Sequence, residues 1–504
     1  MKTTLASQAS LLLVAGLTIA VLLTVGPASS PSTAATPDPC PYPLTEANRP
    51  VAPPTAPAER ASFTDPTAET QGADFVKVGE QVYVAPFARL EAQSAVDVIC
   101  IGHAANVQDN TLLKVSGGRM DLGDYSIVAH GAQMVGDGGP VSIAYRDACP
   151  LPAPGTPPDV WTTAAERGRQ ALANALAGAG VTSPDCTKVP AFIGFNALNH
   201  SHIEDGALLS VMSRLQPGVV LRAGYTTYPG KSLNSQTEAD TAGADFTRFK
   251  VRYVTAGDVV FMNAVVHVNE CLAKGYTRQY RDTARAVHPF GGPESIHGIG
   301  IDPGSYHRCA FNTDSERPTI GYAPDADLTV RDLRLAVSDP NPSKKIRIIG
   351  DARLVDIDKI QDHVSIRADE GEPFSFRGGI EWGFANTFHA LETEAEDPVR
   401  DVRLRANVKL EERVLVHGGG RRLRAGGPDG EPTQIDDNAI IGKEAVVFRS
   451  HVSAGTKVGA RAVLAGYDNG CDAGGNCTLA EVIPDGCVKF SDTPANTCAY
   501  HVEW

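Results

Sequence analysis

The stretch Val76-Lys-Val-Gly-Glu-Gln-Val-Tyr-Val-Ala-Pro-Phe-Ala-Arg-Leu90 places aliphatic or small residues at short, repeating intervals. The same pattern returns in four later segments, at 192–198, 203–209, 346–352 and 439–446. Repeats of this kind stack short strands into a parallel β-helix, in which each coil buries its apolar residues against the next coil. The sequence therefore predicts a β fold built from hexapeptide repeats.

Two segments have the apolar spacing of helices instead. One runs from Trp161 to Leu176, with Asp159 as its expected N-terminal cap and glycines just beyond its end. The other runs from Asp258 to about Arg281. We expect the first to decorate the β-helix and the second to follow its last coil.

Composition divides the chain into two such domains. Glycine (49 residues) and proline (35) are plentiful while aromatic residues make up only 6%, which is typical of turn-rich β architecture. A segment rich in Gly, Pro, His and Ser at 286–317 reads as a linker. It predicts a first domain at 70–285, with an insertion at 137–190, and a second domain at 318–504 that ends in a Cys-rich tail.

The N-terminal region predicts export from the cytoplasm. Lys2 precedes an apolar run over 11–26 and then small residues, so residues 1–35 resemble a cleaved signal peptide more than an uncleaved anchor. Residues 36–69 read as a disordered linker rich in Pro, Ala, Ser and Thr. We therefore expect a secreted or otherwise extracytoplasmic protein, either periplasmic or extracellular.

Ten cysteines, an even number, fit an oxidising compartment. The pairs that are close enough to join, or that bracket an insertion, are Cys471/Cys477, Cys487/Cys498 and Cys149/Cys186. The net charge is −14, from 45 Lys and Arg against 59 Asp and Glu, and the sequence has no basic patch of the nucleic-acid-binding type. We expect no nucleic-acid partner.

Polar residues fall into two incomplete motifs, one in each predicted domain. The second domain has Arg367-Ala-Asp369-Glu370-Gly, then His389-Ala-Leu-Glu392, then Val-His417-Gly. The first domain has Asn106-Val-Gln108-Asp109, then Val-Ala-His130-Gly. Each set contains what the other lacks.

Together the two sets resemble the signature of the γ-class carbonic anhydrases. The resemblance covers nearly all of 76–285 and 346–490, apart from the 137–190 insertion. It implies left-handed β-helices, a threefold ring, and a metal held by three histidines. In that family two of these histidines come from one subunit and the third from its neighbour.

Neither domain has the full ligand set. In the second domain, Glu381-Trp-Gly-Phe384 replaces the Asn-Val-Gln-Asp segment, and Glu412 stands at the middle histidine position. In the first domain, Lys114 and Val135 stand at the outer two histidine positions, while Glu91, Gln93 and Ser94 replace the Arg-x-Asp-Glu residues. The surviving residues are complementary, which predicts one composite site between the domains.

The resemblance gives each residue of this composite site a role. His130, His389 and His417 would bind zinc, or iron or cobalt, as neutral imidazoles. Gln108, supported by Asn106, would orient the attacking hydroxide, and Asn269 on the second helix would line the carbon dioxide site. Glu370 and Glu392 would relay the proton outward. Arg367 would form a buried ion-pair network with Asp369 and Asp109.

The expected activity is the reversible hydration of carbon dioxide to bicarbonate. A catalytically inactive scaffold with the same fold predicts no bound metal. A hexapeptide-repeat acyltransferase is disfavoured in an exported protein because acyl-coenzyme A is cytosolic. Two unlike domains cannot alternate evenly around a threefold ring, so we expect an oligomer of the chain, or a third γ-like partner subunit, to complete the ring.

Overall fold

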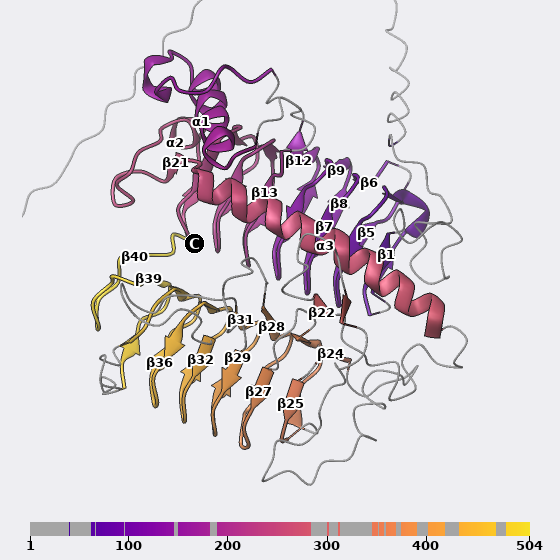
Figure 1. The fold of residues 1–504 in the computed structure, drawn as a ribbon, viewed down its shortest axis with the longest axis vertical. Coiled ribbons are helices and arrows are strands. Elements are labelled where there is room, and N and C mark those ends of the chain that lie inside the picture. Colours follow the sequence, from indigo (N-terminus) through magenta and orange to yellow (C-terminus); the bar gives the residue numbers. More distant parts are fainter. Residues whose placement is uncertain are drawn as a thin grey trace, which may run out of the picture. The chain divides into compact units, whose positions relative to one another are not determined.

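Three sheets wind together through the N-terminal half of the described chain, and each coil contributes one strand to each sheet (Figure 1). The first sheet contains β1 (Phe63–Thr64), β4 (Tyr83–Val84), β7 (Asn106–Val107), β10 (Ile127–Val128), β13 (Phe192–Ile193), β16 (Leu208–Leu209), β19 (Tyr225–Thr227) and β21 (Val251–Tyr253). The second contains β2 (Glu69–Gln71), β5 (Arg89–Ala92), β8 (Leu112–Ser116), β11 (Gln133–Asp137), β14 (Leu198–Asn199), β17 (Arg214–Leu215) and β20 (Ser232–Leu233). The third contains β3 (Val76–Val78), β6 (Val98–Ile101), β9 (Arg119–Leu122), β12 (Val141–Tyr145), β15 (His202–Glu204) and β18 (Val220–Leu221).

A second set of three sheets follows from residue 346 onward. Its largest sheet contains β24 (Ile346–Gly350), β26 (Val364–Ala368), β28 (Thr387–Ala390), β31 (Leu415–Gly418), β34 (Val446–Phe448), β37 (Val463–Ala465), β39 (Cys487–Phe490) and β40 (Tyr500–His501). Another sheet contains β25 (Ala352–Leu354), β27 (Phe374–Phe376), β29 (Val402–Leu404), β32 (Thr433–Ile435) and β35 (His451–Val452). The third sheet contains β30 (Lys409–Leu410), β33 (Ile440–Ile441), β36 (Lys457–Val458) and β38 (Val482–Ile483). We call β1–β21 the first β-helix and β24–β40 the second β-helix.

This computed structural model describes residues 40, 62–65, 67–94, 96–145, 150–181, 189–283, 300–301, 311–312, 345–350, 352–356, 359–368, 374–390, 402–418, 433–469 and 480–504. Every residue described here belongs to one compact unit, Pro39–Trp504. The expected signal segment at 1–35 lies outside the described residues, as do most residues of the predicted linkers. The predicted disorder of 36–69 is wrong at its C-terminal end, where β1 and the start of β2 already belong to the first β-helix, and the predicted linker at 286–317 contains the pair β22 and β23. No helix in the described part of the chain is long and apolar enough to cross a membrane.

The strand pairing confirms the predicted fold class of two parallel β-helices. Every strand pair inside the two β-helices is parallel, apart from the closing pairs β19–β21 and β39–β40. Each β-helix has its own interior core of apolar residues that recur once per sheet per coil, such as Val84, Val107 and Val128 in the first and Ile366, Phe388 and Val416 in the second. The repeated apolar positions thus bury themselves against the coils above and below.

Two longer helices pack on the first β-helix. Helix α1 spans Ala164–Gly178 and begins with a capping box in which Thr163 and Glu166 exchange hydrogen bonds. The cap predicted at Asp159 is therefore wrong: Asp159 lies in a short 3-10 helix (Pro158–Val160), where its carboxylate accepts a hydrogen bond from Tyr253. Helix α3 spans Ala256–Thr283 and crosses successive strands of the first sheet, with contacts to β1, β4 and β10 (Figure 1).

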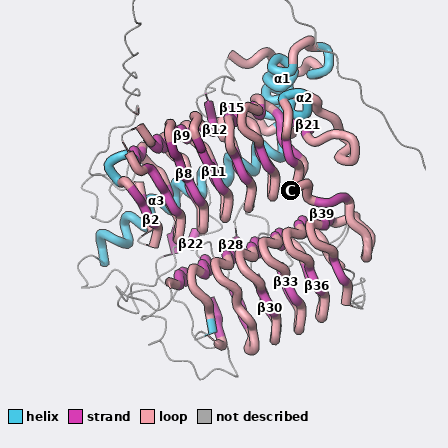
Figure 2. Tube along the Cα trace, turned by 180° about the vertical axis from the view of Figure 1, so that it is seen from behind, coloured by secondary structure: helices cyan, strands magenta, loops and turns pink. Residues whose placement is uncertain are grey.

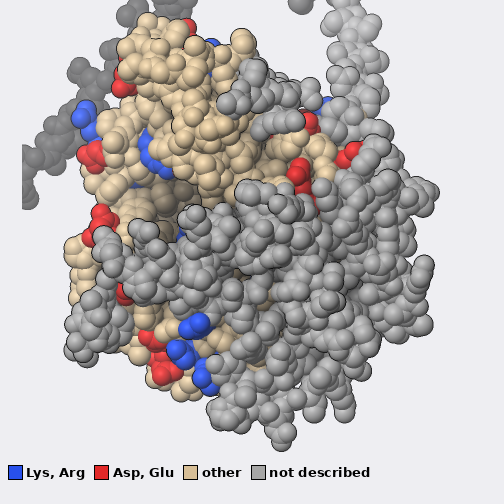
Figure 3. All heavy atoms as spheres, viewed as in Figure 1, with Lys and Arg blue, Asp and Glu red and all other residues tan. Residues whose placement is uncertain are grey.

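The remaining described elements are short. They are a 3-10 helix at Ala73–Phe75, helix α2 (Gln236–Ala239) and the antiparallel pair β22 (Gly300–Ile301) and β23 (Phe311–Asn312). Figure 2 shows α1 and α2 near the same end of the first β-helix. On the face drawn in Figure 3, acidic and basic side chains of the described residues are interspersed.

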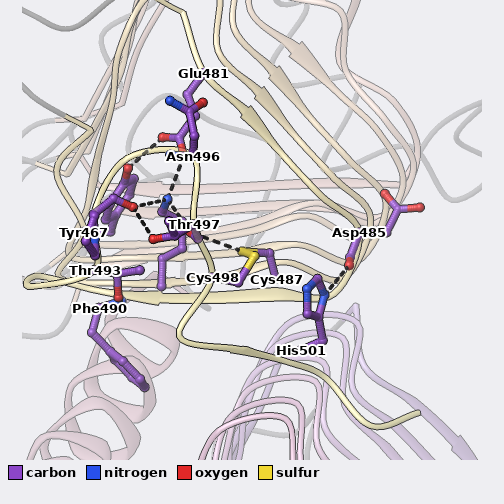
Figure 4. Close-up of a disulfide and its surroundings, with 12 residues drawn as sticks. Tyr467, Glu481, Asp485, Cys487, Phe490, Thr493, Asn496, Thr497, Cys498 and His501 are labelled. Carbon is purple, nitrogen blue, oxygen red and sulfur yellow. Dashed lines mark hydrogen bonds and ion pairs between the residues drawn. A yellow bond between two sulfur atoms is a disulfide. The ribbon is translucent and has the colours of Figure 1, made fainter.

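Disulfides join distant and nearby parts of the chain. Cys487 is bonded to Cys498, as predicted, and this bond secures the closing turn of the second β-helix (Figure 4). Cys40 is bonded to Cys100 on β6, a pairing that the sequence did not indicate. Cys271 on α3 is disulfide-bonded as well. The other two predicted pairs lie outside the described residues.

The two β-helices contact each other through a third apolar cluster and buried ion pairs. The cluster combines α3 and first-sheet residues with Leu415, Val446 and Val463 of the second β-helix. Arg347 Nε lies 2.9 Å from Asp65 Oδ2, and both side chains are at most 4% exposed. The segment after β40 reaches back to the first β-helix, where Glu503 binds two lysines and Trp504 donates a hydrogen bond to the Met212 carbonyl.

Candidate metal centre

Two of the predicted ligands stand on neighbouring strands of the second β-helix. His389 on β28 is in direct register with His417 on β31, and Arg367 on β26 is in register with His389. Phe388 and Val416 belong to the interior core, so the residues that follow them point to the opposite side of the sheet. There the imidazoles meet the first β-helix, where His130 lies.

The third predicted ligand stands at a corner of the first β-helix. His130 follows β10 by two residues, and Gly131 adopts a positive φ of 68°. A Cβ at Gly131 would lie 2.0 Å from Asn196 Oδ1, so a larger residue at this turn would displace the Asn196 side chain. The corner presents the His130 ring to the second β-helix.

The three imidazoles meet at close range. His130 Nε2 lies 3.0 Å from His389 Nδ1, and one nitrogen from each of the three rings falls within 4.8 Å of the others. The side chains are nearly inaccessible, with exposed fractions of 0%, 3% and 3% for His130, His389 and His417. Zinc–nitrogen bonds of about 2.1 Å in a tetrahedral site separate the ligand nitrogens by about 3.4 Å. The set therefore fits a tetrahedral metal ion after small adjustments of the rings.

The neutral state of His417 also suits a metal ligand. Burial, followed by repulsion from His389 and His130, holds the pKa of His417 well below its ordinary value. His417 Nδ1 lies 2.7 Å from the Gly418 carbonyl, to which a neutral imidazole donates its only N–H. Its Nε2 lone pair is then available for a metal.

A carboxylate stands behind His130. Asp109 Oδ2 lies 2.9 Å from His130 Nδ1, although the N–H is directed off the line of a well-formed hydrogen bond. The same oxygen accepts a hydrogen bond from Arg367 Nη1 at 2.8 Å, and the other oxygen accepts one from Ser365 Oγ at 2.6 Å. Burial alone would raise the pKa of Asp109, but the Arg367 guanidinium and then His130 lower it below its ordinary range. Asp109 is therefore a carboxylate held by groups from both β-helices.

The expected orienting residues flank this corner. Val107 faces the interior core, so Asn106 and Gln108 on either side of it face outward. Both are buried, at 0% and 4% exposed, and the Asn106 amide has no hydrogen-bond partner among the described residues. Neither side chain forms a hydrogen bond with an imidazole in this part of the chain. Asn269 on α3 is 3% exposed and donates to the Val265 carbonyl one turn earlier.

Asp369, Glu370 and Glu392 lie outside the described residues. Glu412, at the middle histidine position of the second domain, forms an exposed ion pair with Lys443 at 2.9 Å. Lys114, in turn, is in register with both Glu91 and Val135 on the second sheet of the first β-helix.

Two aromatic residues that sequence reasoning missed line one side of the centre. Phe448 is in register with His417 on the next strand, and its ring lies 5.4 Å from that imidazole. Phe195 contacts His417, His130 and Phe448, with ring centroids 4.9, 5.6 and 5.6 Å apart. One face of the three-histidine cluster is therefore apolar.

No protein-family model matches the chain, and no curated protein matches it. Among solved structures, the chain is similar to a hexapeptide transferase family protein from Anaplasma phagocytophilum. The two share 16% sequence identity with a TM-score of 0.23, over 42% of this chain and 91% of that chain. The fold described above rests on the strand pairing rather than on this likeness.

Proposed function

We propose that this chain is a zinc-dependent carbonic anhydrase that interconverts carbon dioxide and bicarbonate at one site between its two β-helices. The observation that carries the proposal is the meeting of three buried histidines, two from one β-helix and one from the other. Iron or cobalt would be accepted by the same imidazoles. Zinc held there would act as a Lewis acid that makes water a nucleophile near neutral pH, as it does in carbonic anhydrase.

The chain's own groups would prepare this chemistry. His130, His389 and His417 would hold the metal, and the Asp109 carboxylate would keep the N–H of His130 on Nδ1 so that Nε2 faces the metal. Gln108 would orient the attacking hydroxide, with Asn106 behind it. The apolar wall formed by Phe195 and Phe448 suits an uncharged substrate such as carbon dioxide.

Proton removal is proposed on sequence grounds alone. The product proton must reach bulk solvent, and Glu370 and Glu392 would carry it there.

The disulfides Cys40–Cys100 and Cys487–Cys498 support the proposal that the protein works outside the cytoplasm.

Metal content by mass spectrometry, paired with stopped-flow carbon dioxide hydration, tests the proposal on the full chain. We expect about one metal ion per chain and measurable hydration. His130→Ala should abolish both, although the two histidines of the second β-helix remain. His200→Ala is a matched control, because His200 lies in the first β-helix outside the cluster and its Nδ1 contacts the Val135 carbonyl. Metal-free, inactive protein after reconstitution with zinc, iron and cobalt would instead identify a structural scaffold.

A further inference from the structure

Ser365 is a fully buried residue of the second β-helix that no motif singled out. It lies on β26, two residues before Arg367, and is 0% exposed. Its Oγ donates a 2.6 Å hydrogen bond to Asp109 Oδ1 on the first β-helix, 256 residues away in sequence. A charge-assisted hydrogen bond of this length, shielded from water, constrains both partners strongly.

Asp109 is held in place from the opposite β-helix. Ser365 binds one carboxylate oxygen, and Arg367 binds the other. The next residue, Asn110, also reaches across, donating to Thr387 Oγ1 at 2.8 Å. The second β-helix therefore fixes the position and the rotation of the Asp109 carboxylate.

The Asp109 carboxylate also stands beside His130 Nδ1, where it would set the orientation of the imidazole. A histidine that binds a metal through one nitrogen needs an acceptor at the other, which selects the tautomer and fixes the ring plane. Asp109 Oδ2 lies 2.9 Å from His130 Nδ1 and is available for this role only while the carboxylate does not rotate. Arg367 shares Oδ2 with His130, whereas Ser365 alone among the described residues donates a hydrogen bond to Oδ1 and so opposes rotation.

We infer that Ser365 is a positioning residue for metal binding, acting through Asp109 on the single ligand contributed by the first β-helix. The inference rests on the proposed function only as far as the three histidines bind a metal. The second β-helix then supplies two ligands and also orients the third.

The test is zinc affinity of the full chain, measured by competition with a chromophoric chelator. Loss of such an outer hydrogen bond typically weakens metal affinity about 10- to 100-fold, so Ser365→Ala should bind zinc at least about tenfold more weakly. Ser126→Ala is the matched control. Ser126 is also 0% exposed, but its hydroxyl has no hydrogen-bond partner in the described structure, and its removal should leave the affinity unchanged.

A second pair of variants keeps the test decisive if Ser365→Ala does not fold. Ser365→Thr and Ser365→Val have nearly the same shape, and only threonine keeps the hydroxyl. We expect the threonine variant to bind zinc at least about tenfold more tightly than the valine variant. Urea unfolding of the zinc-free variants separates this effect from a loss of stability, which alone would not change the affinity of the folded chain.

Equal zinc affinity of the Thr and Val variants, or a Ser365→Ala affinity within about twofold of wild type, would overturn the inference. A wild-type chain that binds zinc but does not hydrate carbon dioxide would overturn the proposed function and leave the role of Ser365 intact. A wild-type chain that binds no metal would overturn both.

Discussion

The Arg367–Asp109 pair makes a sharp prediction about stability. The two side chains are 1% and 0% exposed, and Arg367 Nη1 lies 2.8 Å from Asp109 Oδ2. With the charge centres about 4 Å apart and an effective dielectric constant of about 20, their attraction is about 4 kcal/mol. Arg367→Met removes the cation and leaves a buried carboxylate without its main partner. Such a change typically costs about 3–5 kcal/mol, so we expect the free energy of unfolding of the zinc-free chain to fall by that amount.

Urea denaturation followed by circular dichroism measures this loss. Asp109→Asn and the double variant complete a mutant cycle, and the double variant should lose clearly less than the sum of the two single losses. Arg461→Met is the control, because the Arg461–Glu444 pair at 3.0 Å has a cation that is 47% exposed. Its loss should cost at most about 1 kcal/mol. If Arg367→Met costs as little as this control, or if the losses simply add, the reasoning about the buried pair is wrong.

Two further predictions concern pH and packing. The pKa of His417 is depressed in the folded state. As pH falls below about 6.5, this residue therefore gains a proton in the unfolded chain only. The free energy of unfolding of the zinc-free protein should then fall by up to about 1.4 kcal/mol per pH unit because of this residue. Urea titrations between about pH 7 and pH 5 should show this slope, reduced in His417→Gln; an unchanged slope would contradict it. Gly168→Ala should lower the free energy of unfolding by about 1–3 kcal/mol, despite the better helix propensity of alanine. The reason is that a Cβ at position 168 would lie 2.1 Å from the Ala223 carbonyl oxygen. A higher thermal midpoint of that variant would refute the packing argument.

The fold could be predicted because a β-helix repeats its requirement once per coil. Val84, Val107 and Val128 each have to fill the same interior position, and that need is visible in the local spacing of the sequence. The start of α1 was misjudged for a local reason. Asp159 and Thr163 are both competent caps, and only the Thr163–Glu166 exchange, visible in the structure, decides between them.

The candidate site could be predicted only where a family motif marked it. His130, His389 and His417 were found by their motifs, and their roles stay predictions, as do the threefold ring and the third subunit. Phe448 was missed because its contact with His417 depends on the register of two adjacent strands. Ser365 and Phe195 were missed because their importance depends on contacts between segments more than 200 residues apart, such as the 256-residue separation of Ser365 from Asp109. No local periodicity reports a contact of that kind. The buried Arg347–Asp65 pair, with partners 282 residues apart, was missed for the same reason.

The strand registers explain why this chain should hold one metal site between its β-helices. In the second β-helix the aligned positions are Arg367, His389 and His417. The aligned positions on the second sheet of the first β-helix are Glu91, Lys114 and Val135, which offer no imidazole.

The second β-helix in turn lacks the histidine that the first β-helix contributes. The position in the second β-helix that matches His130 is Glu412, and it is committed to an exposed ion pair with Lys443. A second site with the roles of the two β-helices reversed would therefore have no histidine ligand at all. The predicted ligands of each β-helix lie on the side that contacts the other β-helix, and the groups that neutralise and orient Asp109 lie across that same interface. The candidate metal site and the contact between the β-helices thus depend on the same residues, so a substitution that loosens one should weaken the other.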